Sequence, residues 1–254
     1  MSWILAARSV PPGRLRLFCF PFAGGGAAVF RSWQRQLEHV EVCAVQRPGR
    51  GARILAEHSS RLPDLAAGAC GALQSEMVPP FALFGHSFGA LLAFEVAREL
   101  RRSGAPGPDH LFVSGRRAPR LPEPGPAMHG LPDAEFVAEI RERFDGIPPA
   151  ILQEPEILQL LLPALRADMA ALETYTYRPE EPLDCPITAF GGEDDPWATQ
   201  DELEAWREET SASFVTRRFP GGHFYLQQAE PRLLPALAER MSEAAATATV
   251  KTGP

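Results

Sequence analysis

The stretch FALFGHSFGALLAFEVAREL, residues 81–100, decides the fold that the sequence predicts. Its apolar start ends at Gly85, and an amphipathic pattern resumes at Ala90. A short apolar run followed by helical periodicity predicts a buried strand that leads directly into a helix. A lone serine, Ser87, lies at the junction, and Gly89 follows two residues later. The junction must be tight, because glycines leave room where other side chains would collide.

The sequence Gly85-His86-Ser87-Phe88-Gly89 fits the pattern G-x-S-x-G. Between a strand and a helix, this pattern places a nucleophilic serine on a strained turn that lifts its hydroxyl above the edge of the sheet. The helix N-terminus and the Phe88 N–H would favour a negative charge that develops there. An ordinary glycine-bounded turn is the alternative, and the strand–turn–helix context favours the nucleophile.

The alternation of strand and helix continues on both sides of this stretch. Five further β-rich runs occupy residues 15–20, 40–46, 110–115, 186–192 and 213–219. Helical patterns cover residues 30–37, 62–77, 88–100, 200–209 and 231–244. Such alternation indicates a parallel sheet flanked by helices. The predicted fold class is α/β, with the mostly parallel central sheet of an α/β-hydrolase fold.

A helical insertion interrupts this alternation. Four prolines in residues 119–126 cannot continue a regular element, and residues 133–177 then follow a helical pattern. We therefore expect a single α/β-hydrolase domain over residues 1–254, with a helical lid insertion at about 120–182. Residues 245–254 are expected to form a disordered tail, because chain ends are often poorly ordered.

His223 is the candidate base for the Ser87 nucleophile. A serine hydroxyl attacks weakly unless a base takes its proton. In this fold the order along the chain is serine, acid, histidine, and each partner lies in a loop after a late strand. His223 follows the last predicted strand, and beyond His129 it is the only histidine in the sequence. A surface histidine without a catalytic role is the alternative.

The candidate acid lies in the loop after the run at residues 186–192. This loop contains Glu193, Asp194 and Asp195. Asp195 is favoured because Pro196 fixes the turn after it, and Asp194 remains the alternative. The acid would hold the tautomer of His223, which would deprotonate Ser87 and later activate water.

The loop FPFAGGG, residues 20–26, is the candidate source of a second oxyanion donor. Its glycines would let backbone amides approach a substrate carbonyl closely. We predict that the backbone N–H groups of Ala23 and Phe88 form the oxyanion hole. Nucleotide binding is disfavoured, because neither G-x-G-x-x-G nor a following G-K-S/T is present.

Composition argues against several other classes of protein. The net charge of −7 disfavours a nucleic-acid partner, which would require a basic face. No run approaches the ~20 apolar residues of a membrane helix, and the first residues lack the pattern of a signal peptide. We expect a cytoplasmic protein with no membrane association. The sequence suggests no metal ligands and no cofactor.

Six blocks of the chain together resemble the type II thioesterases of polyketide and nonribosomal peptide biosynthesis. The blocks, in order, are FCFPFAGGGAAVFRSW (18–33), VQRPGRGAR (45–53), FALFGHSFGALLAFEVARELR (81–101), LLPALRADMAALETYTY (161–177), GGEDDP (191–196) and FPGGHFYL (219–226). One departure is FDGIPPAIL (144–152), within the predicted lid, where the family more often has a GG-T-P type segment. This departure puts substrate selectivity in doubt.

The resemblance implies a nucleophile at Ser87, an acid at Asp195, a base at His223, and oxyanion amides at Ala23 and Phe88. Such enzymes hydrolyse aberrant, stalled or intermediate acyl groups from the phosphopantetheine arm of acyl or peptidyl carrier proteins. The carrier would act in trans, and we expect a monomer. The alternatives are a general carboxylesterase, a product-releasing or cyclising thioesterase, and a non-catalytic binding module with this fold.

Several other residues have more than one interpretation. His86 is adjacent to Ser87, but neighbours across a tight turn cannot easily meet, so a packing role is favoured over a role as base. Arginines at positions 47, 50, 53, 116 and 117 could receive a carrier protein or a pantetheine phosphate, or could be ordinary surface charges. Three apolar residues of the predicted lid could line an acyl chamber or only pack between helices: Leu165, Met169 and Leu172.

Overall fold

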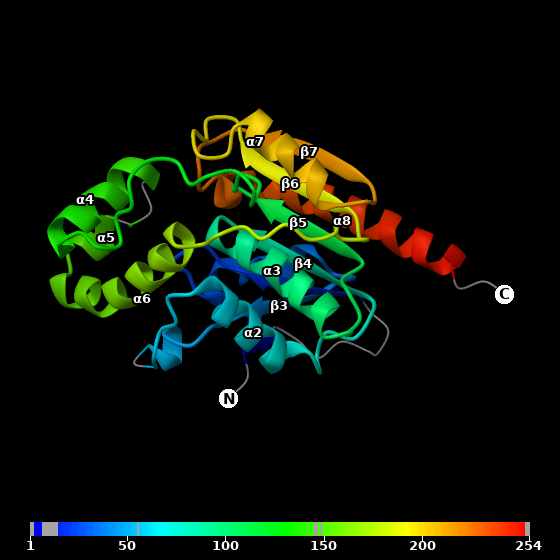
Figure 1. Ribbon diagram of the computed structural model, residues 1–254, viewed down its shortest axis with the longest axis horizontal. Helices are drawn as coiled ribbons and strands as arrows, with labels where there is room; N and C mark the ends of the chain where they lie inside the picture. Colours follow the sequence, from blue (N-terminus) through cyan, green and yellow to red (C-terminus); the bar gives the residue numbers. More distant parts are fainter. Residues whose placement is uncertain (1–2, 7–14, 55, 145–146, 148, 252–254) are drawn as a thin grey trace.

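The computed structural model describes residues 3–6, 15–54, 56–144, 147 and 149–251. Within them, seven strands form one sheet in the order β1-β3-β2-β4-β5-β6-β7 (Figure 1). The strands are β1 (Ile4–Ala6), β2 (Arg16–Phe20), β3 (Glu41–Val45), β4 (Phe81–His86), β5 (His110–Ser114), β6 (Ile187–Gly192) and β7 (Phe214–Phe219). Strands β2 to β7 are parallel, and β1 pairs with β3 in the antiparallel sense.

Helices cover both faces of this sheet. The helices of the described residues are η1 (Ala27–Phe30), α1 (Trp33–Gln36), η2 (Gly51–Arg53), α2 (Leu62–Leu73), α3 (Phe88–Arg102), α4 (Asp133–Phe144), α5 (Pro149–Leu152), α6 (Pro155–Glu173), α7 (Gln200–Glu204), η3 (Ala205–Glu209) and α8 (Leu226–Lys251). Along β2, Phe18 and Phe20 join the core under α2 and α3, whereas Leu17 and Cys19 join the core under α1 and α8. Burial on both faces explains why the strand reads as a continuous apolar run.

The fold class predicted from the sequence is confirmed, with two local differences. All six predicted strands are present, each displaced by no more than one residue at either end. Strand β1 was missed, because three residues are too few for a periodic pattern to show. Helix α8 continues over residues 245–251, where the sequence predicts a disordered tail. Alanines 244–246 have high helix propensity, which favours this continuation.

Helices α4, α5 and α6 form a separate layer beyond the carboxyl ends of the strands (Figure 1). We call the segment from α4 to α6 the insertion. It lies between β5 and β6 in the sequence, yet these two strands are hydrogen-bonded neighbours in the sheet. The chain therefore leaves the sheet, builds the insertion, and returns to the adjacent position. Residues 145, 146 and 148 of the departure at 144–152 lie outside the described residues.

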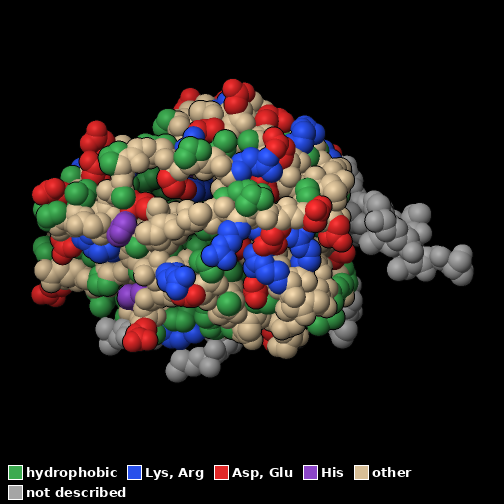
Figure 2. Space-filling model, viewed as in Figure 1, with side chains coloured by type: hydrophobic (Ala, Val, Ile, Leu, Met, Phe, Trp, Pro, Cys, Tyr) green, Lys and Arg blue, Asp and Glu red, His purple; other side chains and the backbone are tan. Residues whose placement is uncertain are grey.

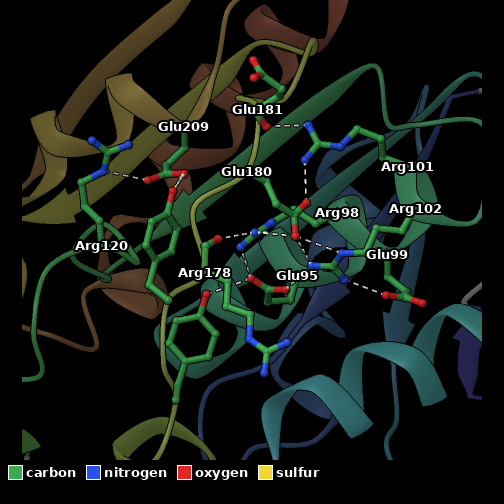
Figure 3. A network of polar contacts seen from close by, with 12 residues as sticks. Glu95, Arg98, Glu99, Arg101, Arg102, Arg120, Arg178, Glu180, Glu181 and Glu209 are labelled. Atoms are coloured by element: carbon green, nitrogen blue, oxygen red, sulfur yellow. Dashed lines mark hydrogen bonds and ion pairs between the residues drawn. The ribbon is translucent and has the colours of Figure 1, made fainter.

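A network of ion pairs holds the segment after the insertion against α3 (Figure 3). The buried guanidinium of Arg98 lies 2.7 Å from Glu95 and 2.7 Å from Glu180. Arg102 also pairs with Glu180, at 2.9 Å, and the Tyr175 hydroxyl donates to Glu95 at 2.8 Å. On this face of the molecule, basic and acidic side chains are interspersed (Figure 2). These contacts therefore hold the segment between α6 and β6 against α3.

Strand β5 contains a buried histidine that should make stability depend on pH. Burial, with a smaller contribution from the charge of Arg240, lowers the pKa of His110 to about 3. Its Nε2 lies 2.9 Å from the Thr188 hydroxyl, and its ring stacks on Phe112 at 4.2 Å. Between pH 6.5 and 3 the unfolded chain binds a proton here that the folded chain does not, so stability is lost as the pH falls through this range.

We expect His110→Gln, which can still hydrogen-bond to Thr188, to reduce this pH dependence. Urea unfolding at a series of pH values between 7 and 4 would measure it. The slope of the unfolding free energy against pH should be smaller than in the wild type by about one proton. Equal slopes in the two proteins would show that His110 titrates normally in the folded state.

Candidate active site

The turn that carries Ser87 has the strained geometry that its sequence predicts. Ser87 has φ +54° and ψ −117°, and it is the only non-glycine residue with positive φ in the described part of the chain. A Cβ at Gly85 would lie 2.0 Å from the Gly89 carbonyl oxygen, and one at Gly89 would lie 2.1 Å from the Phe20 carbonyl oxygen. Both positions therefore exclude side chains, and α3 begins directly after the serine.

Two further side chains meet Ser87 at the carboxyl edge of the sheet. His223 Nε2 lies 2.9 Å from Ser87 Oγ, and His223 Nδ1 lies 2.8 Å from Asp195 Oδ2. Asp195 is 2% exposed, and its second oxygen accepts the Trp197 backbone N–H at 2.9 Å. Asp194 is exposed. Of the two aspartates that the sequence left open, the one in contact with His223 is Asp195.

Close contact between two loops brings the aspartate to the histidine. Asp195 follows β6 and His223 follows β7, two adjacent parallel strands. A Cβ at Gly192 would lie 2.4 Å from the carbonyl oxygens of both Gly221 and Gly222, so the loops pack backbone against backbone. The missing side chain at Gly192, three residues before Asp195, permits this approach.

His86 is a buried neighbour of the site that contacts both Ser114 and His223. Its Nδ1 pairs with the Ser114 hydroxyl at 2.9 Å, and Ser114 in turn lies 2.6 Å from the Tyr225 hydroxyl. The ring is fully buried and packs against that of His223, with centroids 5.4 Å apart. Burial first, and then the neighbouring His223, lower the pKa of His86 well below its usual value. An uncharged, packed imidazole agrees with the packing role favoured from the sequence.

A cleft opens above Ser87 and His223, between the sheet and the insertion. Its empty volume, part of it open to solvent, is about 800 Å³. Leu165, Met169 and Leu172 of α6 line it, so these residues do face a chamber. The other lining residues include Phe144, Trp197, Met128, Ile140, Arg116, Arg143, Glu123 and Glu173. The cleft lining thus combines apolar residues with four charged side chains, two of them, Arg143 and Glu173, from the insertion.

The loop predicted to supply an oxyanion donor borders the same cleft. Ala23 lines it together with Ser87. Phe88 N–H is at the first position of α3, directly after Ser87, and the Phe88 side chain is buried. The backbone amides of Ala23 and Phe88 are thus candidates to serve one reacting oxygen.

The arginines considered as docking residues are mostly engaged inside the protein. Arg47 and Arg50 are 3% and 4% exposed, and both pair with Asp168 of α6. Arg116 pairs with Glu123 and Arg117 with Glu202. Burial, with a smaller contribution from Arg117, lowers the pKa of Arg116 to about 10. Arg47 and Arg50 are therefore not available as a docking surface.

Asp168 is a residue that the sequence reasoning missed. It lies three residues after Leu165 and four before Leu172, so on a helix it neighbours both of these apolar residues. A carboxylate within an apolar stripe must find positive partners when the stripe is buried. That pattern, read together with the paired arginines of RPGR at 47–50, was the available signal.

Comparisons with known proteins identify the family of the chain. A profile of the thioesterase domain family matches residues 15–244. The gramicidin S biosynthesis protein GrsT of Aneurinibacillus migulanus is 40% identical over 241 residues, which cover 94% of each chain. The fold also superimposes on the RedJ thioesterase of the prodiginine pathway in Streptomyces coelicolor, with TM-score 0.84, 44% identity, and 92% of this chain and 90% of that chain covered.

A third relative is named as a type II thioesterase. The structure of BorB, a type II thioesterase from the borrelidin biosynthetic cluster, matches with TM-score 0.86 and 40% identity over 94% of this chain and 97% of that chain. None of the helices in the described part of this chain is long and apolar enough to span a membrane. With a family profile over most of its length and relatives at this identity, the chain belongs to the thioesterase domain family and is a serine hydrolase of the type II thioesterase class of nonribosomal peptide and polyketide pathways.

Proposed function

We propose that the protein hydrolyses acyl groups from the phosphopantetheine arm of a carrier protein, with Ser87, His223 and Asp195 as a catalytic triad. The observation that supports this most directly is the continuous chain of contacts from Asp195 through His223 to the Ser87 hydroxyl, at 2.8 and 2.9 Å. This arrangement, below a strained nucleophile turn, fits acyl transfer through a covalent intermediate.

In the first half of the reaction, Ser87 Oγ attacks the thioester carbonyl while His223 Nε2 takes the hydroxyl proton. The N–H groups of Ala23 and Phe88 donate to the oxyanion of the tetrahedral intermediate. The carbon–sulfur bond then breaks, and the departing thiolate receives the proton from His223. Asp195 stabilises the imidazolium and fixes its tautomer without itself taking a proton.

In the second half, water replaces the thiol. His223 removes a proton from water as it attacks the acyl-serine, and a second oxyanion forms in the same hole. When this intermediate collapses, the proton returns to Ser87 and a carboxylic acid leaves. Each turnover consumes one thioester and one water, and yields one thiol and one acid.

The α4–α6 insertion acts as a lid in this proposal. Its residues Leu165, Met169 and Leu172 line the cleft and would contact the acyl chain. The substrate is presented by an acyl or peptidyl carrier protein in trans, and the protein removes aberrant, stalled or intermediate acyl groups.

Mass spectrometry of acylated carrier proteins would test this function. We expect incubation with the protein to convert a panel of acyl carriers to the free-thiol form, with a higher kcat/KM than for the matching acyl-CoA or simple ester. Neither acyl-CoA nor a simple ester has a carrier-protein surface, so neither gains affinity for the enzyme from protein docking. A strong preference for the simple ester would instead favour a general carboxylesterase, and a cyclic product would favour a cyclising thioesterase.

A further inference from the structure

The carboxylate of Asp168, on insertion helix α6, is a buried junction between the insertion and the body of the protein. Its side chain is 1% exposed. Oδ1 accepts from Arg47 at 2.7 Å, and Oδ2 accepts from Arg47 at 2.8 Å and from Arg50. Oδ2 also accepts the backbone N–H of Gly24 at 2.8 Å. Four hydrogen bonds from three residues thus converge on one carboxylate.

Through Gly24, the Asp168 carboxylate contacts the loop at residues 20–26, which carries the proposed oxyanion donor Ala23 and is called the oxyanion loop below. Gly24 directly follows Ala23, whose N–H is one proposed oxyanion donor. Its φ of +73° is a conformation that glycine adopts without strain. One turn before Asp168, Leu165 also packs on Gly24, since a Cβ there would lie 3.1 Å from Leu165 Cδ1. Helix α6 therefore holds this glycine through both a polar and an apolar contact.

The second proposed donor is reached through Arg47. The guanidinium of Arg47 lies over the Phe88 ring, 4.5 Å from its centroid, while both of its terminal nitrogens bond to Asp168. A cation over an aromatic face is attracted to it, and the bidentate pair fixes the plane of the guanidinium. Asp168 thus contacts Gly24, the residue after the proposed donor Ala23. Through Arg47 it also acts on the ring of Phe88, the residue that carries the other proposed donor.

The energetics link these contacts to the seating of the insertion. A carboxylate removed from water is strongly unfavourable unless positive groups and N–H donors replace its solvation. Burial opposes the ionisation of Asp168, but Arg47, Arg50 and the Gly24 N–H together hold its pKa below the usual value. Arg50 also donates to the Ala164 carbonyl of α6 at 3.0 Å. All these bonds are available at once only when α6 lies against the loop.

We propose that Asp168 is a positioning residue for the oxyanion hole, so that seating of the insertion helix and assembly of the hole are one event. This inference rests on the proposed function, because it assumes that the Ala23 and Phe88 amides form the hole. Asp168 does not touch the reacting atoms. It fixes the backbone of the loop and the ring beside the nucleophile, and so acts through both.

The variant Asp168→Asn tests this role. An amide cannot accept hydrogen bonds at both oxygen positions, so at least one arginine or the Gly24 N–H loses its acceptor. Displaced donors should lower kcat on an acyl carrier protein by about 10- to 100-fold, less than the 10²–10³ typical for complete loss of one donor. KM should change by less than about threefold, because the effect is on the transition state.

Two inhibitors distinguish a positioning role from general structural damage. A trifluoromethyl ketone analogue of an acyl-pantetheine forms a tetrahedral oxyanion with Ser87, and Asp168→Asn should weaken it by the same factor as kcat. A non-hydrolysable thioether analogue carries no oxyanion, and its affinity should stay at the wild-type value. Tyr175→Phe is the matched control, because it removes a part-buried hydrogen bond that joins the segment after the insertion to Glu95 of α3. It should leave both affinities unchanged.

If Asp168→Asn does not fold, the double variant Arg50→Met/Asp168→Asn removes one positive charge with the negative one and supplies the same comparison. Wild-type kcat and ketone affinity in either variant would overturn the proposal. Equal weakening of the ketone and the thioether would also overturn it, in favour of a purely structural role. If wild-type protein released no acyl group from any carrier, the proposed function would fail, while the ketone affinities would still decide the role of Asp168.

Discussion

The variant Ser87→Ala should fold normally and lose the ability to release acyl groups from carrier proteins. Without the hydroxyl no acyl-enzyme can form, and comparable serine hydrolases lose on the order of 10⁴- to 10⁶-fold in kcat. What remains would be the contribution of substrate binding and the oxyanion amides to direct attack by water. Single-turnover release of a radiolabelled acyl group from a carrier protein has the range to measure this loss.

Stability should be affected far less than activity. Ser87 has φ +54°, which alanine tolerates no better than serine, and its hydroxyl makes no capping bond to α3. Thermal unfolding should therefore give a melting temperature close to that of the wild type. A fluorophosphonate should label the wild type and not the variant. Wild-type turnover by a folded Ser87→Ala protein would exclude this serine as the nucleophile, and failure to label the folded wild type would revive the non-catalytic binding module.

The variants Asp195→Asn and Asp194→Asn should differ by orders of magnitude in activity. Asp195 accepts from His223 at 2.8 Å, so its replacement by an amide would favour the wrong tautomer of the imidazole. A similar change in other triads lowers kcat by about 10⁴-fold. Asp194 is exposed, and its described contact is through its backbone N–H, which donates to the Gly221 carbonyl at 3.0 Å. Its side chain should be dispensable within about twofold, as for most surface changes.

The pair of aspartates provides its own control, because both variants make the same chemical change one residue apart. Steady-state kinetics on one acyl carrier protein, with circular dichroism to verify folding, would measure the difference. Comparable losses in the two variants would mean that the aspartates share the role, and a larger loss for Asp194→Asn would reverse the assignment.

The sequence was most informative where the physics is local. The run at residues 81–86 is apolar because β4 is buried on both faces, and that pattern is visible without a partner strand. Likewise, Gly85 reports a collision within a single turn, because a Cβ there would meet the Gly89 carbonyl oxygen. The positions of the other five predicted strands along the chain followed from the same apolar runs, which is why their ends were predicted within one residue.

The sequence was less informative where a contact depends on packing between distant segments. Strand β1 is held by its pairing with β3, and three residues carry no pattern of their own. From the sequence, the arginines at 47–53 could be either a docking surface or ordinary surface charge. The partner of Arg47 and Arg50, Asp168, is 121 positions from Arg47 and gave no local signal.

By itself, then, the sequence determined a parallel sheet with helices on both faces, and a serine on a strained turn at the edge of that sheet. Strand burial and turn sterics act over a few residues, so the chain records them directly. The tertiary structure decided which aspartate contacts His223, and it turned two arginines from solvent toward a carboxylate on α6. Both outcomes depend on where loops and helices finally pack, because an ion pair is stable away from water only after both partners have been brought together.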